Sequence, residues 1–124
     1  MPAIGYWSKW DWASSCIKVN IPNIITSGWN CSINTANLGN RTVSVTCPSN
    51  AKFAIGIVAS STTYSNKPCS VSIRSSYGLH YISNSATDKR CWARIDPGTT
   101  ISAYTGQNES NTWWMACAVV IYLT

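Results

Sequence analysis

Six cysteines and one histidine are the side chains of this 124-residue chain that could bind a metal or act as a nucleophile or base. The spacings of a structural zinc site, CxxC pairs or cysteine with histidine, do not occur, so we expect no metal and no cofactor. His80 would have to serve any Ser-His-Asp arrangement, but no G-x-S-x-G motif surrounds a serine. We expect it at a half-exposed strand position beside a turn. The four acids are dispersed, whereas glycoside hydrolysis needs two carboxylates at one cleft, so we do not expect an enzyme.

Five of the six cysteines occupy the apolar positions of alternating segments: Cys31, Cys47, Cys69, Cys91 and Cys117. Cys16 occupies a polar position. Five cysteines on the core side cannot all pair with one another, and a core cysteine often behaves as a small buried hydrophobic residue. The chain also begins without the basic and apolar regions of a signal peptide. We therefore expect mostly free thiols, with one or two disulfides as the alternative.

Charge and hydropathy limit the partners. The net charge is +5, but the bases are scattered, and Lys89 with Arg90 is the only adjacent pair. A nucleic-acid site typically shows a cluster of bases, so we expect no nucleic acid. The longest apolar run, residues 112–124, has thirteen residues. Because a membrane-spanning helix needs roughly 20, we expect no membrane insertion.

The apolar run at 112–124 predicts a central strand, because it lacks Gly, Pro and charge and is rich in β-branched and aromatic residues. Its odd-numbered positions, from Trp113 to Leu123, and its even-numbered positions, from Trp114 to Tyr122, are both apolar. A strand with two apolar faces is covered on both sides. Either other strands cover both faces, or one face packs on another copy of the chain.

Shorter alternating segments precede this run, around residues 16–21, 29–33, 42–47, 53–59, 69–73, 79–82, 91–95 and 101–103. No window holds the apolar stripe of a helix, so we expect negligible helix. The pattern predicts an all-β fold, an antiparallel β-sandwich of jelly-roll type with about eight to nine strands, over residues 15–124. Gly56 is a possible bulge site. Residues 1–14 form an aromatic N-terminal arm, which either docks on its own domain or inserts into a neighbour.

Loop lengths separate the two ends of this sandwich. If consecutive strands are antiparallel, the tight turns at 48–50, 75–78 and 96–98 share one end. The long polar loops at 34–41, 60–68, 83–89 and 105–111 share the other, where sandwiches often bind ligands. We predict ligand contacts there through Tyr64, Asn66, Lys67, Asn84, Asn108 and Asn111. Amides and hydroxyls suit sugar hydroxyls, Tyr64 offers a ring for stacking, and Lys67 attracts anionic polymers. The alternative is that these loops are simply solvated.

Four aromatic residues fall at outward positions of the predicted strands: Trp92, Tyr104, Trp114 and Tyr122. Exposed aromatic area of this size would favour aggregation. We therefore predict a subunit interface, and the alternative is that a second sheet or the arm covers these side chains.

The second half of the chain resembles the small β-sandwich knobs at the tips of bacteriophage tail fibres. The resemblance lies in CPSNAKFAIGIV from Cys47, a Ser/Thr-rich loop, CSVSIR from Cys69, and IDPGTTISAY from Ile95 before a Gly/Asn loop and a last apolar strand. It covers residues 45–124 and is one of pattern, which trimeric jelly rolls of the C1q and tumour-necrosis-factor type share. The aromatic arm and the six cysteines depart from it, which leaves open a head-decoration or baseplate role.

The resemblance implies a non-enzymatic homotrimeric virion protein that contacts the host surface or another virion component. Trp7, Trp10 and Trp12 of the arm would then anchor it in the particle. Assembly in the cytoplasm of the bacterial host would agree with free thiols and no signal peptide. The alternative is a secreted, free-standing carbohydrate-binding module, or lectin, whose Trp and Tyr side chains stack on the rings of a surface glycan.

Overall fold

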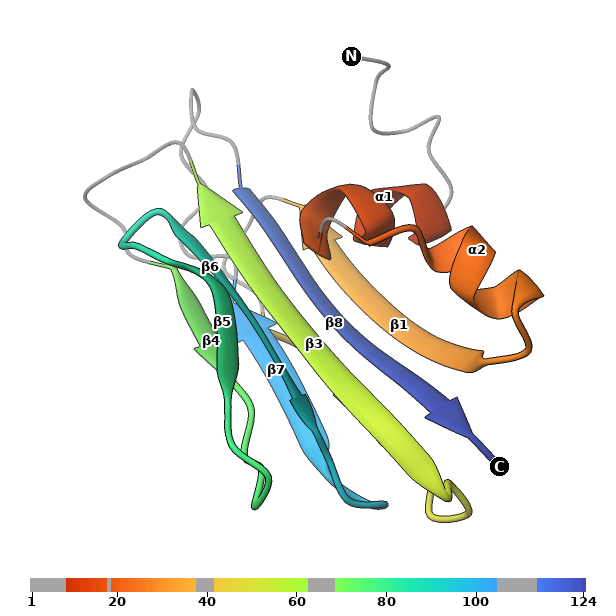
Figure 1. Cartoon of the computed structure of the whole chain (residues 1–124). Helices are drawn as coiled ribbons and strands as arrows, with labels where there is room; N and C mark the ends of the chain where they lie inside the picture. The colour runs from red at the N-terminus through yellow and green to blue at the C-terminus, as the bar shows by residue number, and fades with distance from the viewer. Residues whose placement is uncertain (1–8, 18, 38–41, 63–68, 105–113) are drawn as a thin grey trace.

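The computed structural model of the chain describes residues 9–17, 19–37, 42–62, 69–104 and 114–124 (Figure 1). Two helices and eight strands follow one another in these ranges: α1 (Lys9–Ile17), α2 (Ile21–Thr26), β1 (Asn30–Asn37), β2 (Thr42–Thr46), β3 (Phe53–Thr62), β4 (Ser70–Ser72), β5 (His80–Asn84), β6 (Asp88–Arg94), β7 (Thr100–Tyr104) and β8 (Trp114–Leu123). The strands form a five-stranded sheet, β1-β8-β3-β6-β5, and a three-stranded sheet, β2-β7-β4. Every strand pair is antiparallel, so the predicted all-β sandwich is confirmed.

The predicted strand at 16–21 and the expectation of negligible helix are wrong. Residues 20–28 carry a complete helix signature: Asn20 caps α2 by accepting a hydrogen bond from the Asn23 amide at 3.1 Å, and Pro22 lies in the first turn. Gly28 follows the helix with φ of 98°, a conformation that glycine adopts without steric cost. Because α1 spans Lys9–Ile17, it also crosses the expected boundary between residues 14 and 15.

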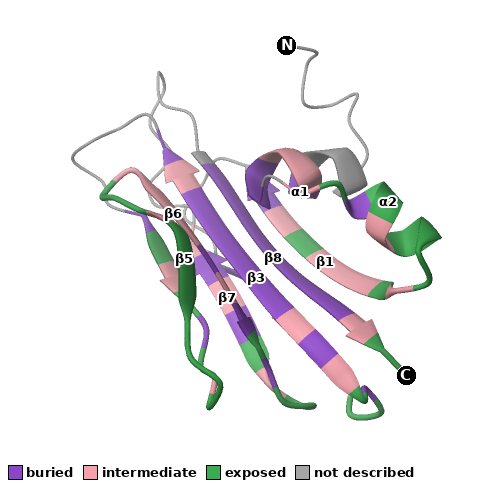
Figure 2. Ribbon diagram, in the orientation of Figure 1, coloured by how far each residue is buried: buried purple, intermediate pink, exposed green. Residues whose placement is uncertain are grey.

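The helices cover one face of the five-stranded sheet, which we call the outer face. Strand β8 lies between β1 and β3, and its odd-numbered side chains, such as Cys117 and Val119, are fully buried beneath α1 and its neighbours. Its even-numbered side chains, such as Ala118 and Val120, are fully buried between the two sheets. Figure 2 shows β8 buried along most of its length. The doubly apolar strand is thus covered on both faces by its own chain, on one side by helices and not by strands.

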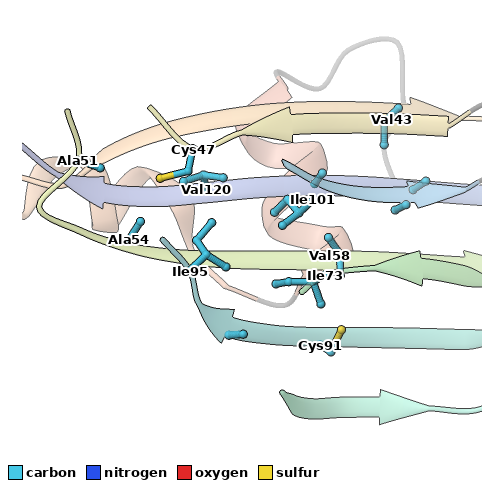
Figure 3. Close-up of a cluster of buried hydrophobic side chains, with 14 of the residues drawn as sticks. Val43, Cys47, Ala51, Ala54, Val58, Ile73, Cys91, Ile95, Ile101 and Val120 are labelled. Carbon is cyan, nitrogen blue, oxygen red and sulfur yellow. The ribbon is translucent and has the colours of Figure 1, made fainter. Parts of the chain in front are cut away.

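Gly56 of β3 faces three isoleucines of the core between the sheets, Ile73, Ile95 and Ile101, which are labelled in Figure 3. A Cβ atom at this position would lie 3.1 Å from the Cδ1 atoms of Ile101 and Ile73 and 3.2 Å from that of Ile95. The expected bulge at Gly56 is wrong, since β3 keeps a regular register with β6 and β8 there. The irregularity in this sheet lies in edge strand β5, between Tyr81 and Ser83. A side chain at position 56 would therefore force these three isoleucine side chains to shift by a few tenths of an ångström.

Strand pairing places the strand ends that flank the long loops at one end of the sandwich, as predicted. Asn37 and Ser61 both pair with Met115, and Thr42 and Ser70 both pair with Tyr104. The two sheets are joined near this end by the buried Ser60 hydroxyl, which donates to the Tyr104 carbonyl at 2.6 Å. Tight turns occupy the opposite end, where the Gly98 amide donates to the Cys47 carbonyl at 2.9 Å.

Candidate functional site

Two adjoining hollows form an apolar groove on the outer face, which we call the outer groove. One, of about 310 Å³, is lined by Asn23, Ile24, Ser27, Trp29, Ile55 and Ile121. The other, of about 270 Å³, is lined by Val19, Ile55, Ile57, Ile82, Trp92 and Ile121. Because Ile55 and Ile121 line both, the hollows form one continuous depression. Its size is in the lower range for ligand-binding pockets, and its lining is aliphatic and aromatic with two polar residues of α2 and the turn that follows.

The register of the five-stranded sheet explains why the floor of the outer groove is apolar. One row of cross-strand neighbours joins Ile121 of β8 to Ile55 of β3 and then to Arg94 of β6. The next row joins Val119, Ile57, Trp92 and His80. Side chains in such rows share one face and lie within contact distance. The helices contact β1, β8 and part of β3. The groove lies where Ile55 and Ile57 of β3 meet Ile121 of β8 and Trp92 of β6.

Aromatic and cationic side chains form one end of the groove. The Arg94 guanidinium carbon lies 4.6 Å from the ring centroid of Phe53 and 4.5 Å from that of Tyr77. Phe53 in turn contacts Trp29 edge to face, with centroids 5.9 Å apart and an interplanar angle of 68°. The Tyr77 backbone is held by its amide, which donates to the Ser75 hydroxyl at 3.0 Å. Arg94 is therefore held in place between two rings beside the groove floor.

His80 extends the aromatic lining along the second row. Its ring stacks on Trp92, with centroids 4.4 Å apart and an interplanar angle of 21°. It lies at the start of β5 after a turn, as expected, although it is exposed and not half-exposed. Within the described ranges, no group of three or more His, Cys, Asp or Glu side chains could hold a metal. The groove thus offers contact surface and one fixed cation.

Arg90 links α1 to the sheet by a hydrogen bond and also forms a salt bridge within its own strand. Arg90 of β6 donates through Nε to the Cys16 carbonyl in the last turn of α1 at 2.7 Å, and through Nη1 to Asp88 Oδ2 at 2.6 Å. Both side chains are largely buried, with 12% of Arg90 and 29% of Asp88 exposed. A cation at the C-terminal end of a helix meets carbonyls that have no partner in the helix. Arg90 thereby fixes α1 to the sheet, and α2, whose Asn23 and Ile24 line the groove, follows α1 along the chain.

Cys47 and Cys91 lie in the core between the sheets, and Cys16 and Cys117 lie in the core beneath α1. Cys69 is also buried, and Cys31 is half-buried. All six are in the described part of the chain, and none forms a disulfide, which agrees with the expectation of free thiols. Cys16 is fully buried and not at a polar position, because it belongs to the apolar face of α1. A hydrogen bond with Cys16, together with burial, raises the pKa of the Cys117 thiol. The Cys117 thiol is therefore a neutral packing group at neutral pH.

Five of the six residues predicted to contact a ligand lie outside the described ranges. They are Tyr64, Asn66, Lys67, Asn108 and Asn111. Asn84 is exposed at the end of β5, on the long-loop end.

The predicted interface residues lie on different surfaces. Trp92 lines the outer groove, whereas Tyr122 packs on the core between the sheets. Tyr104 belongs to β7 of the three-stranded sheet, and Trp114 begins β8 with a side chain outside the described set. Of the side chains that the structure describes, Trp92 and Tyr122 therefore lie on opposite faces of the five-stranded sheet.

The predicted anchoring residues are described only in part. Trp7 lies outside the described ranges. Trp10 and Trp12 belong to α1, but their side chains are outside the described set.

The alternation pattern did not predict the outer groove, because the apolar side chains of its strands were all assigned to the core between the two sheets. Phe53, Ile55 and Ile57 alternate with Ala54 and Val58, and both sets are largely apolar. That double pattern indicates a layer on each side of β3, just as it does for β8. The second layer consists of the helices that the sequence analysis had interpreted as an arm and a strand.

Comparison with known proteins finds no match: no family model, curated protein or solved structure is similar to this chain. The described ranges contain no helix long and apolar enough to cross a membrane. The function is therefore inferred from the outer groove itself.

Proposed function

We propose that the chain is a non-enzymatic virion structural protein, at a tail-fibre tip or as a decoration protein, that attaches to another virion component through the outer groove. The observation that carries the proposal is the apolar depression left open beside α1 and α2. Ile82 on its rim is 48% exposed. Contiguous exposed apolar surface typically marks an interaction site in a folded protein.

The chemistry of the groove supports a binding role. Its lining is aliphatic and aromatic, and the His80 ring is engaged in stacking on Trp92. Sugar recognition would need several convergent hydrogen-bonding groups, whereas the first hollow contributes Asn23 and Ser27. The groove therefore favours a protein partner over a glycan. Contact with a host glycan, if it occurs, is proposed for the long-loop end through Tyr64 and Lys67.

The homotrimer and the virion location are parts of the same proposal. The cover of α1 and α2 over β8 removes one reason for a trimer, since that strand needs no second copy. The proposal of a trimer therefore rests on the resemblance to tail-fibre knobs. Its subunit interface would use surface outside the outer groove. Free thiols agree with assembly in the reducing cytoplasm of a bacterial host.

The proposal is tested with two exposed isoleucines. Ile82→Asp places a charge on the rim of the groove, whereas Ile25→Asp places the same charge on α2, on a residue that is 36% exposed and not part of the groove lining. Particles assembled with each variant are purified and probed with an antibody to the chain. We expect Ile82→Asp to be lost from particles and Ile25→Asp to be retained. Absence of the unchanged chain from particles, or equal retention of both variants, would overturn the proposal.

A further inference from the structure

Arg94 lies directly beside the floor of the outer groove. It is the cross-strand neighbour of Ile55, which lines both hollows, and its side chain lies on the same face. The rings of Phe53 and Tyr77 hold the guanidinium on either side. An arginine held in this way loses little freedom when it binds a carboxylate, and its planar fork suits two parallel hydrogen bonds.

The charge of Arg94 is not neutralised by the residues that the structure describes. Among these residues, Arg90 and Asp88 form an ion pair, whereas Arg94 forms no ion pair. Asp96, two residues along the chain, accepts a hydrogen bond from the Tyr77 hydroxyl at 3.3 Å instead. The outer groove therefore combines apolar hollows with one presented positive charge at the edge of its floor.

A second copy of the chain is a poor match for this combination. The chain has four acids, and Asp88 is already paired with Arg90. Asp96 accepts a hydrogen bond from the Tyr77 hydroxyl. The side chains of Asp11 and Glu109 are outside the described set. The copy would also bring an excess of positive charge, since its net charge is +5. Charge complementarity thus favours a different and more acidic partner.

We propose that the outer groove binds an apolar segment of a partner protein that carries an Asp or Glu side chain, and that this carboxylate pairs with Arg94. Two apolar side chains of the segment fill the hollows, one toward Trp29 and one toward Trp92. The acidic side chain lies between them at the β6 side of Ile55. This assignment rests on the proposed function, because it specifies the chemistry of the virion component that docks there.

The experiment selects binding peptides from a displayed library of random dodecapeptides on the full chain. Three forms are compared: the unchanged chain, Arg94→Glu, and the control Arg74→Glu, which alters another exposed arginine outside the groove lining. We expect the unchanged chain and Arg74→Glu to enrich peptides with two apolar residues and an Asp or Glu. Arg94→Glu should enrich Lys or Arg at the acidic position. Replacing the acid by its amide in an enriched peptide should weaken binding about fivefold, the effect of one exposed but pre-positioned ion pair.

Four results would overturn the inference. Enrichment of apolar peptides without an acid would leave the groove as a docking site and remove the role of Arg94. No enrichment at all, with Ile82→Asp still lost from particles, would retain the proposed function and refute a peptide-like occupant. Self-association in sedimentation that Arg94→Glu abolishes would make the occupant a second copy. Binding of sodium decanoate that depends on Arg94, without peptide enrichment, would identify a small amphiphile.

Discussion

Replacement of Arg90 by Gln tests whether one side chain holds the helical layer on the sheet. Arg90 connects two elements, because it lies in β6 and donates to the Cys16 carbonyl of α1, and it also pairs with Asp88 of its own strand. Gln cannot carry the charge and is too short to make both contacts. The Cys16 carbonyl then loses its donor at the end of α1, and the Asp88 carboxylate is left without a counter-ion.

The expected cost is about 3 kcal/mol of unfolding free energy. Hydrogen bonds to charged groups contribute about 1.5–3 kcal/mol, and breaking a buried pair costs about 3–5 kcal/mol. The lower part of that range applies, because Asp88 is 29% exposed and water can partly solvate it. Asp88→Asn should cost much less, at about 1 kcal/mol or below. Arg90 keeps its bond to Cys16 in that variant, and Asp88 Oδ1, buried without a hydrogen-bond partner among the described residues, no longer carries charge.

Urea unfolding of the purified variants measures these free energies, and amide hydrogen exchange locates the effect. Arg90→Gln should accelerate exchange in residues 9–17 more than in β3 or β8, because the helix loses its tie to the sheet. Arg74→Gln, at an exposed position, is the control and should change stability by less than about 0.5 kcal/mol. A cost below about 0.5 kcal/mol for Arg90→Gln, or an equal cost for Asp88→Asn, would refute the reasoning.

Two further predictions concern the core. Gly56→Val should lower the unfolding free energy in urea by about 2 kcal/mol through overpacking, because even a Cβ atom would lie 3.1 Å from Ile101 Cδ1; partial recovery on adding Ile101→Val is expected, and no loss would contradict the close approach. Burial raises the pKa of the Cys47, Cys69 and Cys91 thiols, and a hydrogen bond with Cys16 together with burial raises that of Cys117. Since the folded-state pKa values exceed the unfolded value, thiol protonation stabilises the fold fully below about pH 8.5, and stability should fall as pH rises above it. Urea midpoints that are flat from pH 8 to pH 10 would contradict this prediction.

The alternation of apolar and polar residues was sufficient to predict most of the strands and their inward positions. The side chains that face the core between the sheets, as strand parity requires, include Val43, Val45, Ile101, Ala103, Ala116, Ala118 and Val120. The N-terminal region was misread because Ile17, Val19 and Ile21 also fit a strand. Ala13, Cys16 and Ile17 have the helical spacing of three and four residues, and Asn20 with Pro22 gives a start signal. The local pattern fits both a strand and a helix, and packing of this segment against the five-stranded sheet favours the helix.

The outer groove was only partly accessible from the sequence. Trp92 was identified as an outward aromatic residue, but its neighbours were not. Placing Arg94 beside Ile55 requires the pairing of β3 with β6, which skips β4 and β5 along the chain. The alternation along a strand predicts on which face of the sheet each side chain lies. It does not predict which strands are adjacent or in what register they pair. That information lies in long-range contacts, so a site built across strands could not be predicted from local pattern.

The position of β8 has a consequence for how the protein is made. Strand β1 lies at the edge of its sheet and, among the described strands, pairs only with β8. Roughly 80 residues of chain separate the two, so at about 5–20 residues per second a ribosome needs roughly 4–16 s between them. During that delay Cys31 and Ile33 of β1 lack the strand with which they pair, and α1 lacks the part of its surface that β8 provides. The nascent chain must therefore keep its first elements out of wrong pairings until β8 emerges, which makes the amino-terminal third the natural target of a holding chaperone.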